Sequence, residues 1–255
     1  MGAGLTRRRE ASLRFRFMVV ERLRLLKKFY SYSELARRTS TPETVLCRYV
    51  KGDVLPGEDT AKKLWEAMDK IEQFPQVICE KISIDPYGYV DTTGIVSDPL
   101  ILMRASHYVM MKFAGRRITK ILTPAVNGVP IATSIAMLLE VPIVIAKRYK
   151  EMGVRDYIEE SYPSRPYMAT LYVPKNAITA RDDVLIVDDL VRTGSTIQAL
   201  VNIVRKLKAN VSGVFTLISI DDECLKNLRS QYSFPIETVA SIQIQPLYER
   251  SEVYP

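Results

Sequence analysis

The sequence predicts an α/β protein, a parallel sheet with helices on both faces, preceded by a small all-helical domain. Two patterns support this fold class. Residues 11–72 have apolar side chains at helical spacing, whereas beyond residue 75 short apolar runs alternate with helix-length segments. The run at residues 184–187 precedes two acids and a glycine turn, an arrangement typical of the ligand-binding edge of such sheets. We therefore predict two domains, residues 1–74 and 75–255.

The composition is that of a globular chain and excludes several classes of function. Of 255 residues, 47% are hydrophobic and 25% are charged, and no apolar run approaches the roughly 20 residues that span a bilayer. No apolar signal core follows the basic N-terminus, so we predict a cytoplasmic protein without a membrane partner. Three scattered cysteines and one histidine, His107, argue against a zinc centre and a serine–histidine triad.

The first domain is predicted to be helical at residues 14–30, 33–38, 42–51 and 59–71. Residues 1–10 are expected to form a flexible basic arm. Ser33 is expected to cap the second helix, and Thr41 with Pro42 to start the third. Gly52 is expected to end the third helix in a left-handed conformation.

Strands and helices alternate in the second domain. Strands are predicted at residues 118–123, 142–146, 168–173, 184–187 and 214–220, and helices at residues 128–140 and 196–207. Residues 149–167 are polar and charged without a period, which predicts a loop. Residues 239–248 alternate between apolar and polar side chains, which fits either an ordinary edge strand or a strand over a ligand site.

The most specific pattern is VLIVDDLVRTGST, at residues 184–196. Asp188 and Asp189 follow an apolar strand, and the turn at residues 193–196 opens a helix. The first N–H groups of a helix have no partner within the helix and attract phosphate. The pattern thus predicts a ligand with a phosphate on one side and a diol or metal on the other, such as a ribose 5-phosphate. There is no Gly-Lys-Ser/Thr triplet, which excludes a Walker-type loop.

This segment resembles the phosphoribosyl-pyrophosphate motif of type I phosphoribosyltransferases. The resemblance implies their fold, and it implies that Asp188 and Asp189 hold the ribose hydroxyls and, together with the ligand, Mg²⁺. The residues that the resemblance places around the 5′-phosphate are Arg192, Thr193, Gly194, Ser195 and Thr196.

Two upstream segments extend the resemblance. TPAVNGVPIAT, residues 123–133, is similar to the pyrophosphate loop of orotate phosphoribosyltransferases, which implies that Asn127 and Gly128 face the pyrophosphate. AKRYKEMG, residues 146–153, resembles the basic entry to the family's mobile loop. It implies that Lys147 and Arg148 neutralise pyrophosphate charge, the alternative being a solvated surface.

Two departures from the family pattern argue against transfer chemistry and leave ligand binding intact. Hypoxanthine-guanine enzymes have an acid directly before the Thr-Gly pair, whereas this chain has Arg192, which stays protonated and cannot act as a base. The loop after Lys150 contains no histidine, unlike that of orotate enzymes. Purine-operon repressors of the same family resemble this chain in having a cation before the turn.

Positive charge is concentrated in the first domain, where a helix pair resembles a DNA-binding motif. Residues 1–51 contain 13 Lys/Arg and 4 Asp/Glu, which suits a phosphate backbone. Residues 33–57 resemble the helix-turn-helix of phage-repressor-like regulators, the alternative being a helical cap or a dimerisation module. The DNA-contacting residues implied are Glu43, Thr44, Arg48 and Lys51, with Arg7, Arg8 and Arg9 on phosphates or in a minor groove.

We therefore predict a homodimeric transcriptional regulator of nucleotide metabolism. It would bind double-stranded DNA and sense 5-phosphoribosyl-1-pyrophosphate (PRPP) or a nucleotide, with Mg²⁺. The alternative is an active orotate-type phosphoribosyltransferase with a helical appendage. An RNA-binding attenuator of the same family is a third hypothesis, although such a protein would not need a separate helical domain.

Overall fold

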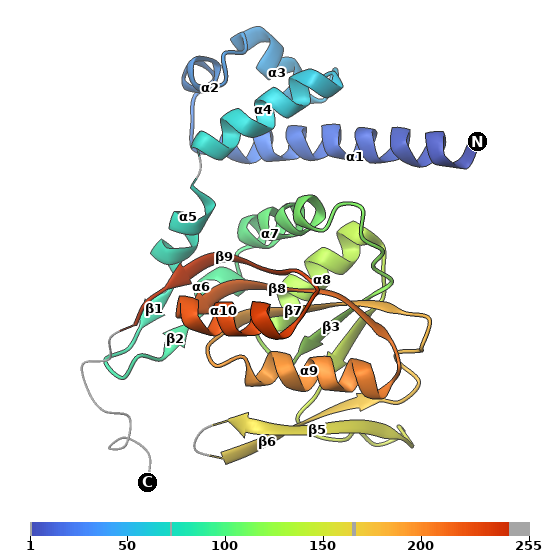
Figure 1. Ribbon diagram of the computed structural model, residues 1–255. Coiled ribbons are helices and arrows are strands. Elements are labelled where there is room, and N and C mark those ends of the chain that lie inside the picture. Colours follow the sequence, from blue (N-terminus) through green and yellow to red (C-terminus); the bar gives the residue numbers. More distant parts are fainter. Residues whose placement is uncertain (1, 72, 165–166, 245–255) are drawn as a thin grey trace. The chain divides into compact units, whose positions relative to one another are not determined.

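The computed structural model describes residues 2–71, 73–164 and 167–244. The chain divides into two compact units, residues 1–74 and 75–255 (Figure 1). The roles assigned above to these two parts of the chain stay predictions. No helix in the described ranges is long and apolar enough to cross a membrane.

The N-terminal unit is a helical bundle. Its helices are α1 (Gly2–Leu26), α2 (Tyr32–Thr39), α3 (Glu43–Lys51) and α4 (Glu58–Ile71). They share one apolar core, in which Leu23, Leu35, Leu46 and Leu64 are excluded from solvent. Gly52 ends α3 with φ 87°, so the predicted left-handed stop is confirmed.

Two local predictions for this unit are wrong. Residues 2–10 belong to α1 rather than to a flexible arm. Helix α2 is capped by Ser31 and not by Ser33, which lies inside the helix. The Ser31 hydroxyl accepts the Glu34 N–H at 3.2 Å, and the Glu34 carboxylate accepts the Ser31 N–H at 2.9 Å. This reciprocal pair satisfies two N–H groups that a lone Ser33 hydroxyl would leave open.

The C-terminal unit is built on a parallel sheet, as predicted. Its strands, in the part of the chain that the structure describes, are β3 (Lys120–Pro124), β4 (Ile143–Ala146), β7 (Asp183–Val191), β8 (Asn210–Ile220) and β9 (Ile236–Ile242). Their order is β4-β3-β7-β8-β9, and all neighbouring pairs are parallel. The carboxyl ends of these strands therefore meet at one edge, where the candidate site lies.

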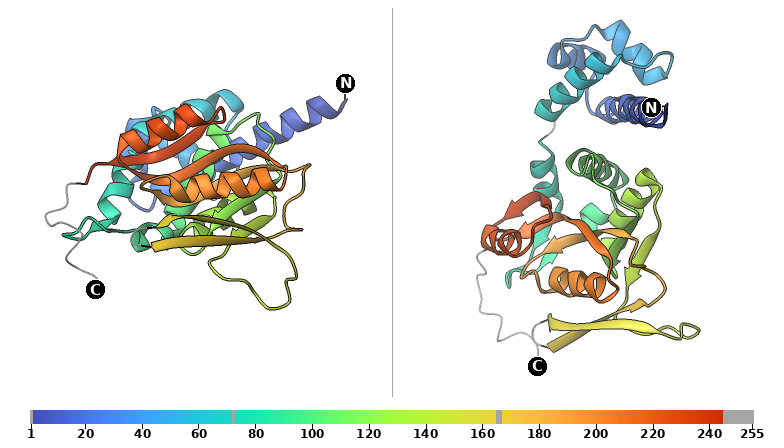
Figure 2. Two further views of the ribbon diagram at one scale, coloured as in Figure 1. Left: turned by 60° about the horizontal axis from the view of Figure 1, so that its bottom comes forward. Right: turned by 45° about the vertical axis from the view of Figure 1, so that its right-hand side comes forward.

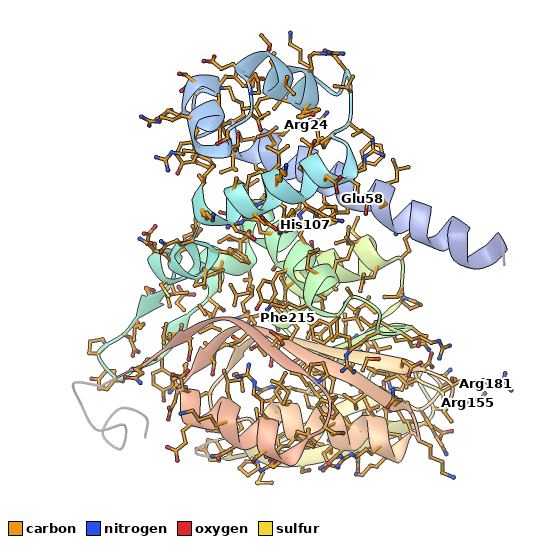
Figure 3. All side chains as sticks on the ribbon, turned by 45° about the horizontal axis from the view of Figure 1, so that its top comes forward. Arg24, Glu58, His107, Arg155, Arg181 and Phe215 are labelled. Carbon is orange, nitrogen blue, oxygen red and sulfur yellow. The ribbon has the colours of Figure 1, made fainter. Side chains whose placement is uncertain are left out.

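Helices cover both faces of this sheet (Figure 2). They are α7 (Pro99–Lys112) and α8 (Gly128–Leu139) on one face, and α9 (Ser195–Lys206) and α10 (Asp222–Gln231) on the other. On the first face Phe215 of β8 (labelled in Figure 3) is fully buried. The centroid of its ring lies 5.9 Å from that of the Tyr108 ring of α7. On the second face, Leu200 and Ile203 of α9 pack against Val184 and Ile186 of β7.

The segment predicted to be a loop at residues 149–167 contains a strand, β5 (Tyr157–Ser164), which pairs antiparallel with β6 (Tyr167–Pro174). The prediction failed because this strand is supported from outside. Tyr162 is buried against the α9 side of the core, and Lys206 of α9 forms an ion pair with Glu160 at 2.6 Å.

Two further strands differ from the predictions. Strand β7 continues past residue 187 to Val191, so both acids lie within it. Strand β9 pairs with β8 at the edge of the main sheet, which is the ordinary-edge alternative. Of the predicted strand at residues 239–248, residues 245–248 lie outside the described residues.

A short segment precedes α7 and was not predicted. It consists of α5 (Phe74–Lys81), the two-stranded ribbon of β1 (Ser83–Ile84) and β2 (Val90–Asp91), and α6 (Thr93–Val96). This segment contributes directly to the candidate site.

Candidate ligand-binding site

The two acids of β7 lie side by side and are almost excluded from solvent. Asp188 is 6% exposed and Asp189 is 8% exposed. The Asp188 carboxylate accepts the backbone N–H of Asp189 at 2.9 Å. Burial, together with the neighbouring charge of Asp189, raises the pKa of Asp188 well above its usual range. A paired acid site of this kind favours a ligand that brings hydrogen-bond donors or a cation.

The turn after β7 has the geometry expected of an anion-binding helix start. Gly194 has φ 77°, and α9 begins at Ser195 directly after it. The hydroxyls of Thr193 and Ser195 lie 2.9 Å apart. A β-carbon on Gly194 would lie 3.0 Å from Leu228 of α10, so both the backbone angle and the packing favour glycine here. The turn thus presents two hydroxyls at the positive end of a helix.

The β5–β6 hairpin reaches this turn. Its strands lie along α9 (Figure 1), where Asn202 donates to Glu160 at 2.8 Å. Near the end of β5, the Pro163 carbonyl accepts the Ser195 hydroxyl at 3.0 Å. A phosphate held at the turn therefore has the end of the hairpin as a neighbour.

The predicted pyrophosphate loop is brought against the acids. Strand β3 ends at Pro124, the peptide between Ala125 and Val126 is cis, and α8 begins at Gly128. A β-carbon on Gly128 would lie 2.5 Å from the Thr123 hydroxyl and 3.0 Å from an Asp188 carboxylate oxygen. Only glycine fits at position 128, and its lack of a side chain lets the start of α8 lie beside β7.

Thr92 is a site residue that the sequence did not reveal. Its hydroxyl donates to Asp189 Oδ2 at 2.6 Å, and the Asn127 side-chain amide donates to the Thr92 hydroxyl at 3.2 Å. Thr92 precedes Asp189 by 97 residues and belongs to no recognisable motif. Only the fold brings it between the acids and the predicted pyrophosphate loop.

Three predicted cations lie in surroundings that the sequence did not suggest. Arg192 donates to the Gly88 carbonyl, and its guanidinium lies 5.8 Å from the centroid of the Tyr89 ring, so it contacts the turn between β1 and β2. Lys147 is paired with Glu151, a hydrogen bond that raises the pKa of Lys147. Arg148 is solvent-exposed. Their assignment to phosphate or pyrophosphate stays a prediction.

The donor set limits how a metal ion could be held. Within the described residues, no group of three or more His, Cys, Asp or Glu side chains could hold a metal ion. Asp188 and Asp189 supply two carboxylates only. These residues fit Mg²⁺ if the ligand itself supplies further oxygen ligands, which is how Mg²⁺ commonly binds with phosphates.

The candidate DNA-contacting residues share one exposed side of α3. The polar residues on that side are Glu43, Thr44, Arg48 and Lys51, whereas Leu46 and Tyr49 are buried. Arg24 of α1 (labelled in Figure 3) donates to the Val50 carbonyl at 2.8 Å and so fixes the end of α3. The contacts predicted for Arg7, Arg8 and Arg9 fall on side chains outside the described part of the structure.

A family model of the phosphoribosyl transferase domain matches residues 97–243, more than half of the chain. The chain belongs to the phosphoribosyl transferase domain family. The matched range contains the acids, the turn after β7 and the Asn127–Gly128 loop of this phosphoribosyl transferase domain. It begins after Thr92 and after the β1–β2 ribbon.

Curated relatives include both regulators and enzymes. The purine biosynthesis transcriptional repressor PurR of Bacillus subtilis (strain 168) is 28% identical over 158 residues, 61% of this chain and 55% of the repressor. The xanthine phosphoribosyltransferase of Heliobacterium modesticaldum (strain ATCC 51547 / Ice1) is 33% identical over 149 residues, 57% of this chain and 79% of that protein. The chain spans about half the length of the PurR proteins it matches.

Solved adenine phosphoribosyltransferases share the fold. The enzyme from Rhodothermus marinus DSM 4252 superposes with a TM-score of 0.59 at 23% identity, covering 66% of this chain and 98% of that chain. The fold class predicted from the sequence is thereby confirmed, as is the resemblance to the phosphoribosyltransferase family. This chain is a phosphoribosyl transferase-fold protein related to PurR regulators and to xanthine phosphoribosyltransferases.

Proposed function

We propose that this protein is a DNA-binding transcriptional regulator of nucleotide metabolism that senses PRPP or a nucleotide through its phosphoribosyl transferase domain. One observation carries the proposal. The same chain combines a phosphoribosyl transferase domain with a basic helical unit whose α3 exposes Thr44, Arg48 and Lys51 on one side. The relation to PurR repressors supports the same function.

The ligand would be held by groups that are already close together. Asp188 and Asp189 would accept the ribose hydroxyls, and the turn from Thr193 to Thr196 would bind the 5′-phosphate. Asn127 and Gly128 would lie along the pyrophosphate. Mg²⁺ bound with the ligand would neutralise pyrophosphate charge, with the two acids as its protein-side partners.

DNA would be bound by the N-terminal unit. The first residues of α3 would face base edges in the major groove, and the surrounding Lys and Arg side chains would contact phosphates. We infer a homodimer, because a twofold protein reads the two halves of a palindromic operator. Ligand changes DNA affinity only if it binds the DNA-competent and incompetent states unequally.

An active phosphoribosyltransferase is the second candidate. The 33% identity to a xanthine phosphoribosyltransferase over 149 residues favours it. Against it, the residue before the Thr-Gly pair is Arg192, whose guanidinium contacts Gly88 and Tyr89 and stays protonated. Transfer to a purine base would therefore need another group in the site to accept the proton that the base loses.

The deciding experiment is DNA binding to the region upstream of the chain's own gene, titrated with and without PRPP and Mg²⁺ at about 0.15 M salt. Specific binding that the ligand changes by more than about fivefold, a coupling of typical allosteric size, supports the regulator. Weak, non-specific binding that the ligand does not change would overturn it. Release of pyrophosphate from PRPP with xanthine, adenine or orotate would then establish the enzyme.

A further inference from the structure

Thr92 lies in the centre of the predicted ligand site. It is 3% exposed and takes part in a chain of hydrogen bonds from Asn127 to Thr92 to Asp189. Its bond to Asp189 is 2.6 Å long and joins a hydroxyl to a carboxylate, which makes it one of the stronger contacts in the site. Thr92 lies outside the range that matches the family model.

Thr92 and a ribose diol would meet at the same carboxylate oxygen. A diol bound at the two acids must donate hydrogen bonds to their carboxylate oxygens. Asp189 is only 8% exposed, and its Oδ2 already accepts the Thr92 hydroxyl. The oxygen could accept a second hydrogen bond, but the carboxylate is almost buried, so a diol that donates to it must enter the space beside the Thr92 hydroxyl. Ligand binding and the position of Thr92 are therefore linked.

A displacement of Thr92 would act directly on the end of α5. Thr92 precedes α6, and a β-carbon on Gly94 of α6 would lie 2.5 Å from the Lys81 carbonyl, the last residue of α5. Lys81 also forms an ion pair of 2.9 Å with Asp98, whose carboxylate caps α7. Helix α6 therefore cannot move toward α5 without displacing α5.

The ribbon between α5 and Thr92 has a second attachment to the site. Arg192, directly before the phosphate-binding turn, donates to the Gly88 carbonyl at the tip of the ribbon. The segment from Lys81 to Asp98 is thus joined to the site at Thr92 and at Gly88. At its other end α5 starts at Phe74, where the chain passes from one unit to the other.

We propose that Thr92 is a positioning residue that reports occupancy of the diol site. A ribose diol takes the place of its hydroxyl on Asp189, and the released segment 81–98 transmits the change to α5. Because α5 begins at the single point where the chain enters the ligand-binding unit, the change reaches the residues that connect it to the DNA-binding unit. The effect on DNA rests on the proposed function, whereas the displacement of Thr92 does not.

The test uses the full-length protein with Thr92→Val, which keeps the shape and removes the hydroxyl, and Thr92→Ser, which keeps the hydroxyl. Calorimetric titration with PRPP and Mg²⁺ should show about fivefold to tenfold tighter binding for Thr92→Val, since the ligand no longer breaks a hydrogen bond to a charged group. Thr92→Ser should bind as the wild type does. Weaker binding by Thr92→Val would overturn the proposal, because it would mean that the hydroxyl contacts the ligand.

Hydrogen exchange gives a second readout that a purely structural role would not affect. In the wild type and in Thr92→Ser, PRPP with Mg²⁺ should increase amide exchange across residues 81–97, whereas Thr92→Val should exchange rapidly there with or without ligand. Bound ligand with unchanged exchange in the wild type would overturn the proposal, whatever happens to DNA. Increased exchange without any effect on DNA affinity would support the role of Thr92 and refute the regulator.

Discussion

A β-carbon added to Gly128 would lie 3.0 Å from a carboxylate oxygen of Asp188, although the two residues are 60 positions apart. The same atom would lie 2.5 Å from the Thr123 hydroxyl. Glycine at this position therefore lets the start of α8 reach the strand that holds both acids. The shape of the candidate ligand site depends on the missing side chain as much as on the acids themselves.

Gly128→Ala should push α8 away from β7. We expect PRPP affinity to fall at least about tenfold and the unfolding free energy of the chain to fall by about 1–3 kcal/mol, the usual cost of overpacking. Calorimetric titration and scanning calorimetry measure the two effects. Gly57→Ala is the matched control, because a β-carbon there meets nothing within 4 Å. Unchanged PRPP affinity in Gly128→Ala would contradict the assigned pyrophosphate loop.

Asp188→Asn should abolish PRPP binding and stabilise the protein. The asparagine keeps an oxygen for the Asp189 N–H and removes a buried charge, so we expect a gain of about 1 kcal/mol at neutral pH. Because the pKa of Asp188 is raised in the folded chain, the wild type loses stability as the pH rises above about 3.9, the value for an unfolded Asp.

The gain from Asp188→Asn should therefore vanish at about pH 3, where the acid is protonated in both folded and unfolded chains. Urea denaturation of both proteins at about pH 3, 5 and 7 measures this dependence. A variant that is less stable than the wild type at pH 7 would show that the Asp188 charge is stabilised by its surroundings.

Arg48→Ala should weaken specific DNA binding about fivefold to 100-fold if Arg48 contacts a base. Lys63→Ala removes an equal charge from an exposed position on α4 and should leave specificity unchanged. Fluorescence anisotropy with operator and scrambled duplexes separates the two effects. Equal losses on both duplexes would assign Arg48 to the phosphate backbone. The slope of the logarithm of the binding constant against the logarithm of the salt concentration should then decrease by about one.

Ser31→Ala should destabilise the N-terminal unit by about 1 kcal/mol, because it removes the capping box of α2. Ser33→Ala should have almost no effect, since Ser33 is an exposed residue inside the helix. Trp65, the single tryptophan of the chain, lies against Phe15 and reports unfolding of this unit through its fluorescence. A larger loss for Ser33→Ala than for Ser31→Ala would contradict the capping geometry.

Much of the fold could be predicted because its signals are local. The apolar run of β7, the glycine stop at Gly52 and the alternation of strands and helices all follow from neighbouring residues. The cap at Ser31 was also readable, since Glu34 three residues later completes a capping-box pattern. Strand β5 was not readable, because its ion pairs join it to residues outside the strand: Glu159 pairs with Lys150, and Glu160 pairs with Lys206 of α9.

The candidate site was predicted from segments that each contain their own chemistry. Asp188, Asp189 and the turn at Gly194 are contiguous, and the structure places Asn127 and Gly128 of the predicted pyrophosphate loop close to the two acids. The surroundings of Arg192 and of Asp189 depend on contacts with residues 88–92, about 100 residues earlier in the chain. No periodicity within either segment indicates such a contact.

The division between Phe74 and Pro75 has a practical consequence. Each unit is one uninterrupted stretch of sequence, so a single crossover between genes exchanges the whole N-terminal bundle and leaves every residue of the ligand site in place. A different N-terminal domain can then be acquired by recombination at one junction, without parallel changes in the sheet. The same junction offers protein engineers a position for joining a different N-terminal module to the phosphoribosyl transferase domain, provided that Phe74 is kept so that α5 stays whole.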